Sequence, residues 1–213
     1  KMSALADEPL LCREVGASPT TSRTTGDRYE DVANCMICGD GESEDDNVIL
    51  FCDGCNLAVH QVCYGGGAVA IPDGPWYCDR CDPARCAGPV ECCLCPEKGG
   101  ALKRTTDWRW AHVVCALWVP NVSFVDPESR DAIDLFGMDE KRFALSCGLC
   151  GVQKGACIQC KERKCMRAFH VTCARKNDLH MTEKERDDWV EFSVYCDKHK
   201  PKPANKRRRK LTA

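Results

Sequence analysis

The 213-residue sequence has no apolar run long enough to cross a bilayer, and no charged-then-apolar segment of the kind that directs secretion. It also lacks the His-x-Glu pattern of zinc deaminases, because its His-x2-Cys motifs continue from the histidine with Gln or Val. Only five residues are histidine. We therefore expect neither membrane association nor deaminase chemistry.

Cysteine, in contrast, is abundant, with 20 residues. Secreted disulfide scaffolds can be equally rich in cysteine. Here, however, most cysteines form Cys-x2-Cys pairs with a histidine at short range, which is the spacing of zinc ligands. Zinc is favoured over disulfides, and with it a reducing compartment, the nucleus or the cytosol. Units of about 50 residues rarely fold without such a metal, so zinc is expected to be required for folding.

The cysteine-rich segments contain an internal repeat. The first segment reads Cys35-x2-Cys38, Cys52-x2-Cys55-x4-His60-x2-Cys63 and Cys78-x2-Cys81. The third reads Cys147-x2-Cys150, Cys160-x4-Cys165-x4-His170-x2-Cys173 and Cys196-x2-His199. Both supply eight ligands with a histidine in fifth place. A shorter segment with four ligands lies between them.

Eight ligands in this order predict a cross-brace, in which ligand pairs one and three share one zinc and pairs two and four share another. Together with the central segment this gives five tetrads: Cys35, Cys38, His60 and Cys63; Cys52, Cys55, Cys78 and Cys81; Cys92, Cys95, His112 and Cys115; Cys147, Cys150, His170 and Cys173; Cys160, Cys165, Cys196 and His199. Cys157 competes with Cys160 for the last site. We prefer Cys160, because Cys165 then takes the place that Cys55 has in the first repeat. Cys93 is expected to pack as a small apolar residue, and His180 to be a surface or packing histidine.

Each predicted zinc has four protein ligands. A catalytic zinc keeps one position open for water or substrate, so these sites are expected to be structural and the chain is not expected to be an enzyme.

Regular secondary structure is predicted to be sparse. Residues 48–51 are expected to form a strand, and residues 111–119 and 169–176 one or two helical turns each. The ligand-free segment 120–145 is expected to pack across the second and third zinc-binding segments. The remaining residues are expected to form loops.

The order of the ligands distinguishes two cross-brace families. A RING finger places its histidine fourth and would indicate a ubiquitin ligase, whereas a PHD finger places it fifth, as here. Trp76 also stands two residues before Cys78, as in PHD fingers. The chain from about Cys35 to His199 resembles the PZP module, in which a zinc knuckle joins a PHD finger to an extended PHD finger. The motifs that carry this resemblance are residues 48–53, 56–61, 95–103 and 110–118. Residues 155–160 and 168–173 are most similar to the BRPF and JADE scaffolds of MYST-type histone acetyltransferase complexes.

This resemblance implies a small zinc-stabilised irregular α+β fold with two cross-brace PHD-type fingers joined by a zinc knuckle. The expected segments are a polar tail (1–31), the first PHD finger (32–84), the knuckle (85–119), the extended second PHD finger (120–200) and a basic tail (201–213). It also implies a subunit that directs an acetyltransferase to nucleosomes, with MYST-type complex subunits as partners. The alternative is a docking scaffold within the complex that does not read histones.

In PHD fingers a histone H3 tail adds as a strand to the short sheet, and a Trp two residues before the histidine commonly helps to enclose methyllysine. Here Ala58 occupies that place, and residues 39–50 contain no aromatic residue but five carboxylates. An unmethylated ammonium retains the N–H donors that carboxylates bind. We therefore predict binding of the unmodified H3 N-terminus by Asp45, Asp46, Asn47, Val48, Ile49, Leu50 and Phe51, with Pro72, Asp73 and Gly74 at its α-amine. A merely solvated acidic loop is the alternative.

Charge is distributed unevenly along the chain. Nine basic residues and one acidic residue lie between Lys141 and Asn177, and a Lys/Arg run follows near the end. We predict non-specific DNA binding by Lys161, Arg163, Lys164 and Arg167 together with Lys206, Arg207, Arg208, Arg209 and Lys210. The terminal run also resembles a nuclear localisation signal. Alternatively, the basic side chains only offset the charge of the zinc-bound thiolates.

Overall fold

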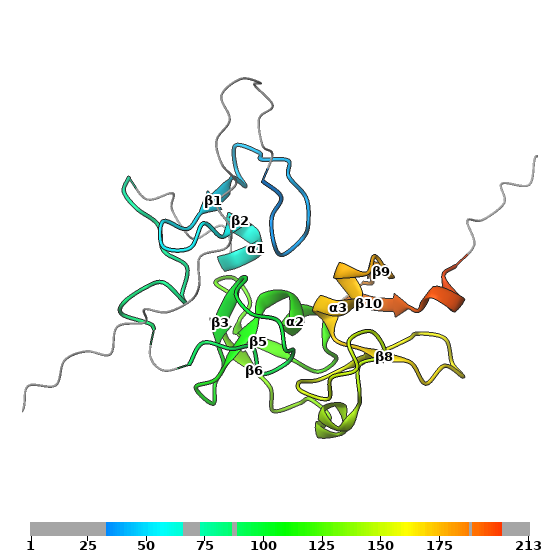
Figure 1. Cartoon of the computed structure of the whole chain (residues 1–213). Coiled ribbons are helices and arrows are strands. Elements are labelled where there is room, and N and C mark those ends of the chain that lie inside the picture. Colours follow the sequence, from blue (N-terminus) through cyan, green and yellow to red (C-terminus); the bar gives the residue numbers. More distant parts are fainter. Residues whose placement is uncertain (1–32, 66–72, 87–88, 188, 202–213) are drawn as a thin grey trace, which may run out of the picture.

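The computed structural model describes residues 33–65, 73–86, 89–187 and 189–201. Within these residues, short strands pair into antiparallel two-stranded sheets, and short helices connect or follow them (Figure 1). This is the small, irregular, zinc-finger type of α+β fold that the sequence predicts. In the described part of the chain, no helix is long and apolar enough to cross a membrane.

One supersecondary unit, a hairpin followed by a short helix, occurs three times. In the first finger it comprises β1 (Ile49–Phe51), β2 (Ala58–His60) and α1 (Gln61–Gly65). In the knuckle it comprises β3 (Leu102–Arg104), β4 (Trp110–His112) and α2 (Val113–Trp118). In the last finger it comprises β7 (Ile158–Gln159), β8 (Ala168–Phe169) and α3 (Val171–Lys176). The expected strand and both expected helical segments are thus present.

The change from strand to helix occurs at the zinc-binding histidine. His112 and His170 are both extended, with φ of −66° and ψ of 140° and 146°, and a helix begins at the next residue. The cysteine three positions later is therefore on the first helical turn, next to the histidine. This local geometry is why the His-x2-Cys spacing recurs in all three units.

The ligand-free segment forms a hairpin and a 3-10 helix: β5 (Ser123–Asp126), β6 (Asp131–Asp134) and η1 (Glu140–Ala144). A parallel bridge joins Thr105 of the knuckle to Ile133 of β6, and Ile133 is completely buried. Most apolar side chains of this segment belong to the same core as the ligands of the knuckle and of the last finger, whereas Val125 and Phe136 are exposed. The segment packs across both, as expected.

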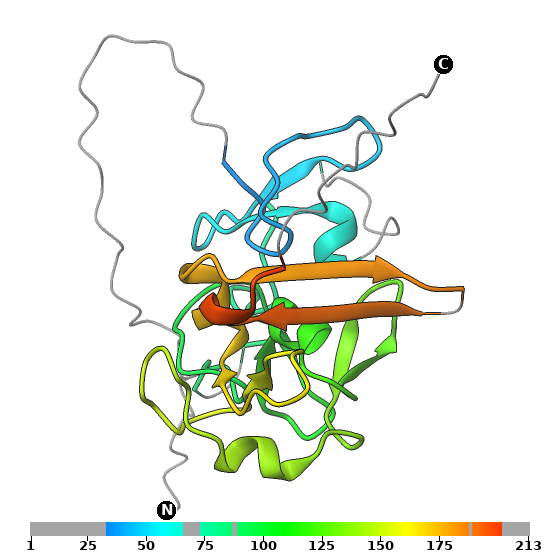
Figure 2. The same cartoon turned by 90° about the vertical axis from the view of Figure 1, so that its right-hand side faces the viewer.

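The expectation of loops elsewhere is wrong for the segment before the last ligands. It forms the longest hairpin, β9 (His180–Glu185) and β10 (Val190–Tyr195), followed by η2 (Asp197–His199) (Figure 2). Met181 pairs with Val194 and packs on the core, whereas the strands are otherwise mostly polar or charged. Val190, Phe192 and Val194 of β10 alternate with Glu191 and Ser193, a strand signal that the sequence prediction missed, whereas β9 shows no such alternation.

The first finger joins the knuckle through a buried charge network. Lys103 of β3 is only 4% exposed, and its Nζ lies 2.9 Å from Asp131 Oδ1 and 3.8 Å from Asp79 Oδ1. The same ammonium lies 4.7 Å from the centre of the Tyr64 ring, and the Tyr64 hydroxyl donates to the Leu102 carbonyl at 2.9 Å. At this contact the ammonium of the knuckle therefore faces a carboxylate of the first finger, and the Tyr64 hydroxyl of the first finger binds the backbone of the knuckle.

The last finger contacts both other units. Arg175 of α3 donates to the carbonyls of Met36 and Ile37 in the first finger, at 3.1 and 2.6 Å. On the knuckle side, Ala156 N donates to the Leu94 carbonyl at 3.0 Å, and a Cβ on the neighbouring Gly155 would lie 2.6 Å from that carbonyl. Only glycine permits this approach. Through these contacts with the first finger and with the knuckle, the last finger joins the other units in one module.

Candidate metal centres and binding surfaces

The structure brings all five predicted tetrads together. In each set the four ligand atoms lie within 4.8 Å of one another. A zinc tetrahedron with Zn–S bonds of about 2.3 Å has S–S edges of about 3.8 Å. The observed separations fit this: Cys55 and Cys78 Sγ are 3.7 Å apart, and Cys165 and Cys196 Sγ are 3.9 Å apart. The five clusters therefore fit five zinc ions.

In all four histidine-containing clusters the histidine points Nδ1 at the metal position. This atom lies 3.2 Å from Cys38 Sγ in the first finger and 3.2 Å from Cys95 Sγ in the knuckle. The corresponding distances in the last finger are 3.5 Å from His170 to Cys150 and 3.2 Å from His199 to Cys196. The other ring nitrogen of His60 and of His112 faces a backbone carbonyl, at 2.7 and 2.6 Å, and such second contacts fix the ring orientation.

Backbone amides stabilise the thiolates in a pattern that repeats. The amides of His60, His112 and His170 donate to Cys35, Cys92 and Cys147 Sγ at 3.2, 3.3 and 3.4 Å. These donors favour the deprotonated, metal-binding form of the thiol.

The cysteines that were predicted not to bind zinc lie outside the clusters. Cys157 is completely buried, donates to the Leu145 carbonyl, and has a pKa raised to about 12 by burial. Cys160 is the residue that faces Cys165, Cys196 and His199. Cys93 is half-buried against the core, and His180 packs beside Tyr195 with ring centres 5.7 Å apart.

In the first finger, the edge of β1 opposite β2 is unpaired among the described strands. Gln61 N donates to the Val48 carbonyl and Cys52 N to the Leu57 carbonyl. Because backbone groups alternate in direction along a strand, those of Ile49 and Phe51 point to the open edge. The Ile49 amide donates there to Ser43 Oγ at 3.2 Å, a hydroxyl that an incoming strand would replace.

The predicted α-amine site lies at the C-terminal end of β1. Asp53 N donates to the Trp76 carbonyl at 2.9 Å, and Trp76 N donates to Asp53 Oδ2 at 2.8 Å. This pair of bonds holds Trp76 beside the end of the strand, and Asp73 and Gly74 precede Trp76 by three and two residues. Pro72 is outside the described residues.

The acidic loop lies at the other end of β1. Asp45 and Asp46 are exposed, and no ion pair involves either of them within the described residues. Ala58 is buried, 7% exposed, so the position of the usual Trp offers no ring. Asn47 contributes to the loop through its side chain, which accepts from Val62 N at 3.1 Å.

The structure divides the predicted DNA-binding residues into two classes. Lys161 pairs with Glu191 at 2.5 Å, and Arg167 pairs with Asp197. Arg163 and Lys164 are exposed and have no ion pair with any residue that the structure describes. The run from Lys206 to Lys210 is outside the described residues.

Comparison with known proteins supports a common architecture. A family model described as a PHD-zinc-finger like domain matches residues 90–199, and one described as a PHD-finger matches residues 46–82. The crystal structure of the zebrafish PHF14 PZP superposes with a TM-score of 0.64 at 36% identity, over 78% of this chain and 88% of that one.

Similar curated sequences are much longer. Protein Jade-1 of Xenopus laevis is 43% identical over 182 residues, covering 84% of this chain and 21% of that protein. Human Bromodomain and PHD finger-containing protein 3 is 43% identical over 227 residues, covering 98% of this chain and 18% of that protein. This chain thus spans about a fifth of the length of these relatives.

Proposed function

Because this chain belongs to the PZP family of the JADE and BRPF type, we propose that it reads chromatin, binding the unmodified histone H3 tail with its first finger and DNA with its last. We further propose that it works in the nucleus, within a scaffold subunit of a MYST-type acetyltransferase complex, and that it catalyses no reaction itself. The ligand sets support the last point, since each provides four protein ligands and leaves no open zinc position.

The observation that carries the histone proposal is the arrangement along β1. A peptide with its α-amine at Gly74 would run antiparallel to β1, from Phe51 toward Asn47. At about 3.3 Å per residue, the fourth residue of such a strand lies roughly 10–13 Å from the first, which brings it to the acidic loop. The lysine at that position of H3 would then meet Asp45 and Asp46.

Unmodified H3 N-terminal peptide is expected to bind better than the peptide trimethylated on this lysine, because residues 39–50 supply no aromatic ring to enclose the methyl groups. Replacing Asp45 and Asp46 by Asn should weaken binding of the unmodified peptide by about 1–3 kcal/mol, through loss of charge-assisted hydrogen bonds. Calorimetric titration of both peptides measures the two effects.

Glu128→Gln is the control, since it removes an exposed carboxylate from the β5–β6 turn. Equal affinity for the two peptides would contradict the assigned lysine site. Retained assembly with complex subunits after loss of peptide binding would separate reading from docking.

For DNA, Arg163 and Lys164 are expected to contribute more than Lys161 and Arg167, whose charges are already paired. The double variant Arg163→Gln, Lys164→Gln should reduce the salt dependence of duplex binding, by a slope of about one for each phosphate that the protein no longer neutralises. Fluorescence anisotropy at several salt concentrations, with two unrelated duplexes, tests this.

The variant Lys161→Gln, Arg167→Gln is the matched comparison, and deletion of residues 206–210 measures the tail separately. If the tail deletion abolishes binding and both finger variants bind normally, the last finger does not contact DNA.

A further inference from the structure

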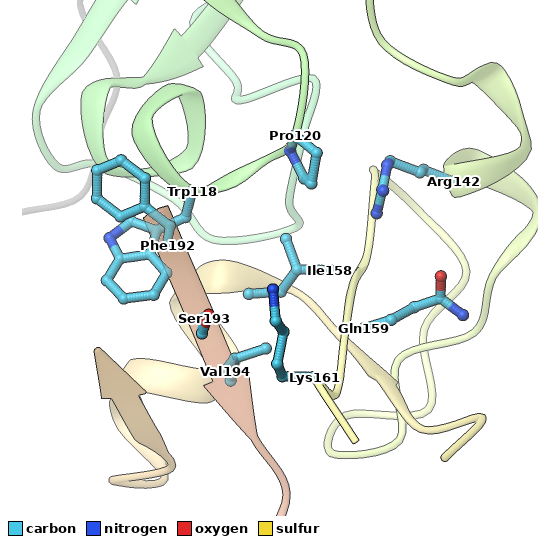
Figure 3. Close-up of a pocket in the computed structure, with 9 residues that line it drawn as sticks. All are labelled: Trp118, Pro120, Arg142, Ile158, Gln159, Lys161, Phe192, Ser193 and Val194. Atoms are coloured by element: carbon cyan, nitrogen blue, oxygen red, sulfur yellow. The ribbon is translucent and has the colours of Figure 1, made fainter. Parts of the chain in front are cut away.

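A pocket of about 170 Å³ opens in the last finger, next to the cluster that contains Cys160 and Cys196 (Figure 3). Its apolar lining includes Trp118, from the end of the knuckle helix α2, Ile158 from β7, and Phe192 and Val194 from β10. Three elements that are distant in the sequence therefore form one site. This volume is small for a cofactor, since small-molecule sites usually measure about 300–1,000 Å³.

The apolar part of the pocket is rigid. Trp118 and Phe192 pack edge to face with ring centres 5.0 Å apart. Ile158 and Val194 are 4% and 3% exposed and belong to the central core. The pocket is therefore preformed, which reduces the entropy lost when a side chain enters it.

The polar groups of the pocket are mainly cationic. In Figure 3 the guanidinium of Arg142 lies across the pocket from Trp118 and Phe192, with Lys161 Nζ between them. Arg142 Nη1 donates to the Cys157 carbonyl at 3.0 Å, but its Nε is buried and has no hydrogen-bond partner among the described residues. Because Nε is enclosed, a ligand in the pocket can reach only the outer nitrogens of the guanidinium.

Lys161 shows that this rim accepts a carboxylate. Its Nζ lies 2.5 Å from Glu191 Oε1, and Glu191 also binds Arg186 through its other oxygen. A carboxylate from a partner could bind Arg142 in the same way, at the opposite side of the opening.

We infer that this pocket binds an acidic peptide segment of a partner protein, with one bulky apolar side chain inserted and a neighbouring carboxylate on Arg142. The apolar lining takes the side chain, as anchors do in protein interfaces, and Arg142 selects the acidic flank. DNA fits less well, because its phosphates and sugars would leave the apolar walls unfilled. An acidic segment is opposite in charge to a histone tail, so this is a separate partner and a separate site.

The test uses the zinc-loaded full chain and acetylated, amidated pentapeptides of the form Gly-Glu-X-Glu-Gly, with X as Leu, Ile, Met, Phe or Ala. NMR signals of the Ile158 and Val194 methyl groups report binding. At least one bulky residue should shift these signals and bind about tenfold or more tightly than Ala. Replacing the flanking Glu by Gln in that peptide should weaken binding several-fold.

Gln159 supplies matched charge variants, because it is exposed and lines the same pocket. Gln159→Glu should weaken binding of the acidic peptide several-fold and Gln159→Lys should strengthen it. Ser123→Glu and Ser123→Lys, on the exposed side of β5, should change neither. The inference is overturned if no peptide shifts the two methyl groups, if Ala binds as well as the bulky residues, or if only a DNA duplex shifts them.

Discussion

Replacement of Cys115 by Ser is expected to unfold the first finger and the last finger as well as the knuckle. Cys115 is completely buried, and the other knuckle ligands, Cys92, Cys95 and His112, are buried too. Structural zinc contributes about 10–16 kcal/mol in zinc-finger peptides, comparable to the whole stability of a domain. Losing it from the shared core should therefore remove most of the bound zinc, measured by elemental analysis, and the dispersion of amide signals throughout the chain.

Two variants separate this effect from the loss of a thiol. Cys157→Ala removes a buried cysteine that lies outside the clusters, and should retain five zinc ions with a loss of about 1 kcal/mol. Cys165→Ser affects a site farther from the centre and should release one zinc while the first finger stays folded. A Cys115 variant with a native first finger would show that the units fold independently.

Replacement of Lys103 by Ala is expected to lower the free energy of unfolding by about 3–5 kcal/mol. The ammonium is buried, and removing it leaves two carboxylates, Asp79 and Asp131, with Arg85 as their one remaining cation among the described residues. It also removes the donor to the Ser129 carbonyl, which lies 3.1 Å away. Urea unfolding of the zinc-loaded chain at neutral pH measures the loss.

Asp79, which faces Lys103, provides the internal control. Asp79→Asn in the Lys103→Ala background should restore part of the stability, because Arg85 then faces one carboxylate, Asp131, rather than two. Lys98→Ala, at an exposed position of the knuckle, should change stability by no more than about 0.5 kcal/mol. A loss below about 1 kcal/mol for Lys103→Ala would mean that water replaces the ammonium.

The zinc ligands could be predicted because the spacing that brings each pair together is local. His60 and Cys63 occupy a strand end and the adjoining helical turn, whatever the rest of the fold does. Choosing Cys160 over Cys157 succeeded for a related reason, since the internal repeat supplied a comparison within the same chain.

The contacts between units could not be predicted in this way. Lys103 and Arg175 look like ordinary surface cations in the sequence, and only the packing of distant segments buries the first and directs the second to backbone carbonyls. The pairing of Lys161 with Glu191 depends equally on the β9–β10 hairpin. Long-range pairing leaves little local pattern, and strand propensity depends strongly on context.

The docking of Arg175 has a consequence for how this family can vary. The guanidinium binds the carbonyls of Met36 and Ile37 rather than their side chains, so the identity of those two residues matters little to the contact. Gly39 is different: its φ is +89°, and a Cβ there would lie 3.2 Å from Arg175 Nη2. A side chain at Gly39 would be strained at this φ, and the end of Arg175 would have to shift by a few tenths of an ångström, so changes at these two positions should be coupled. Substitutions in the first finger are therefore expected to depend on the residue present in the last finger.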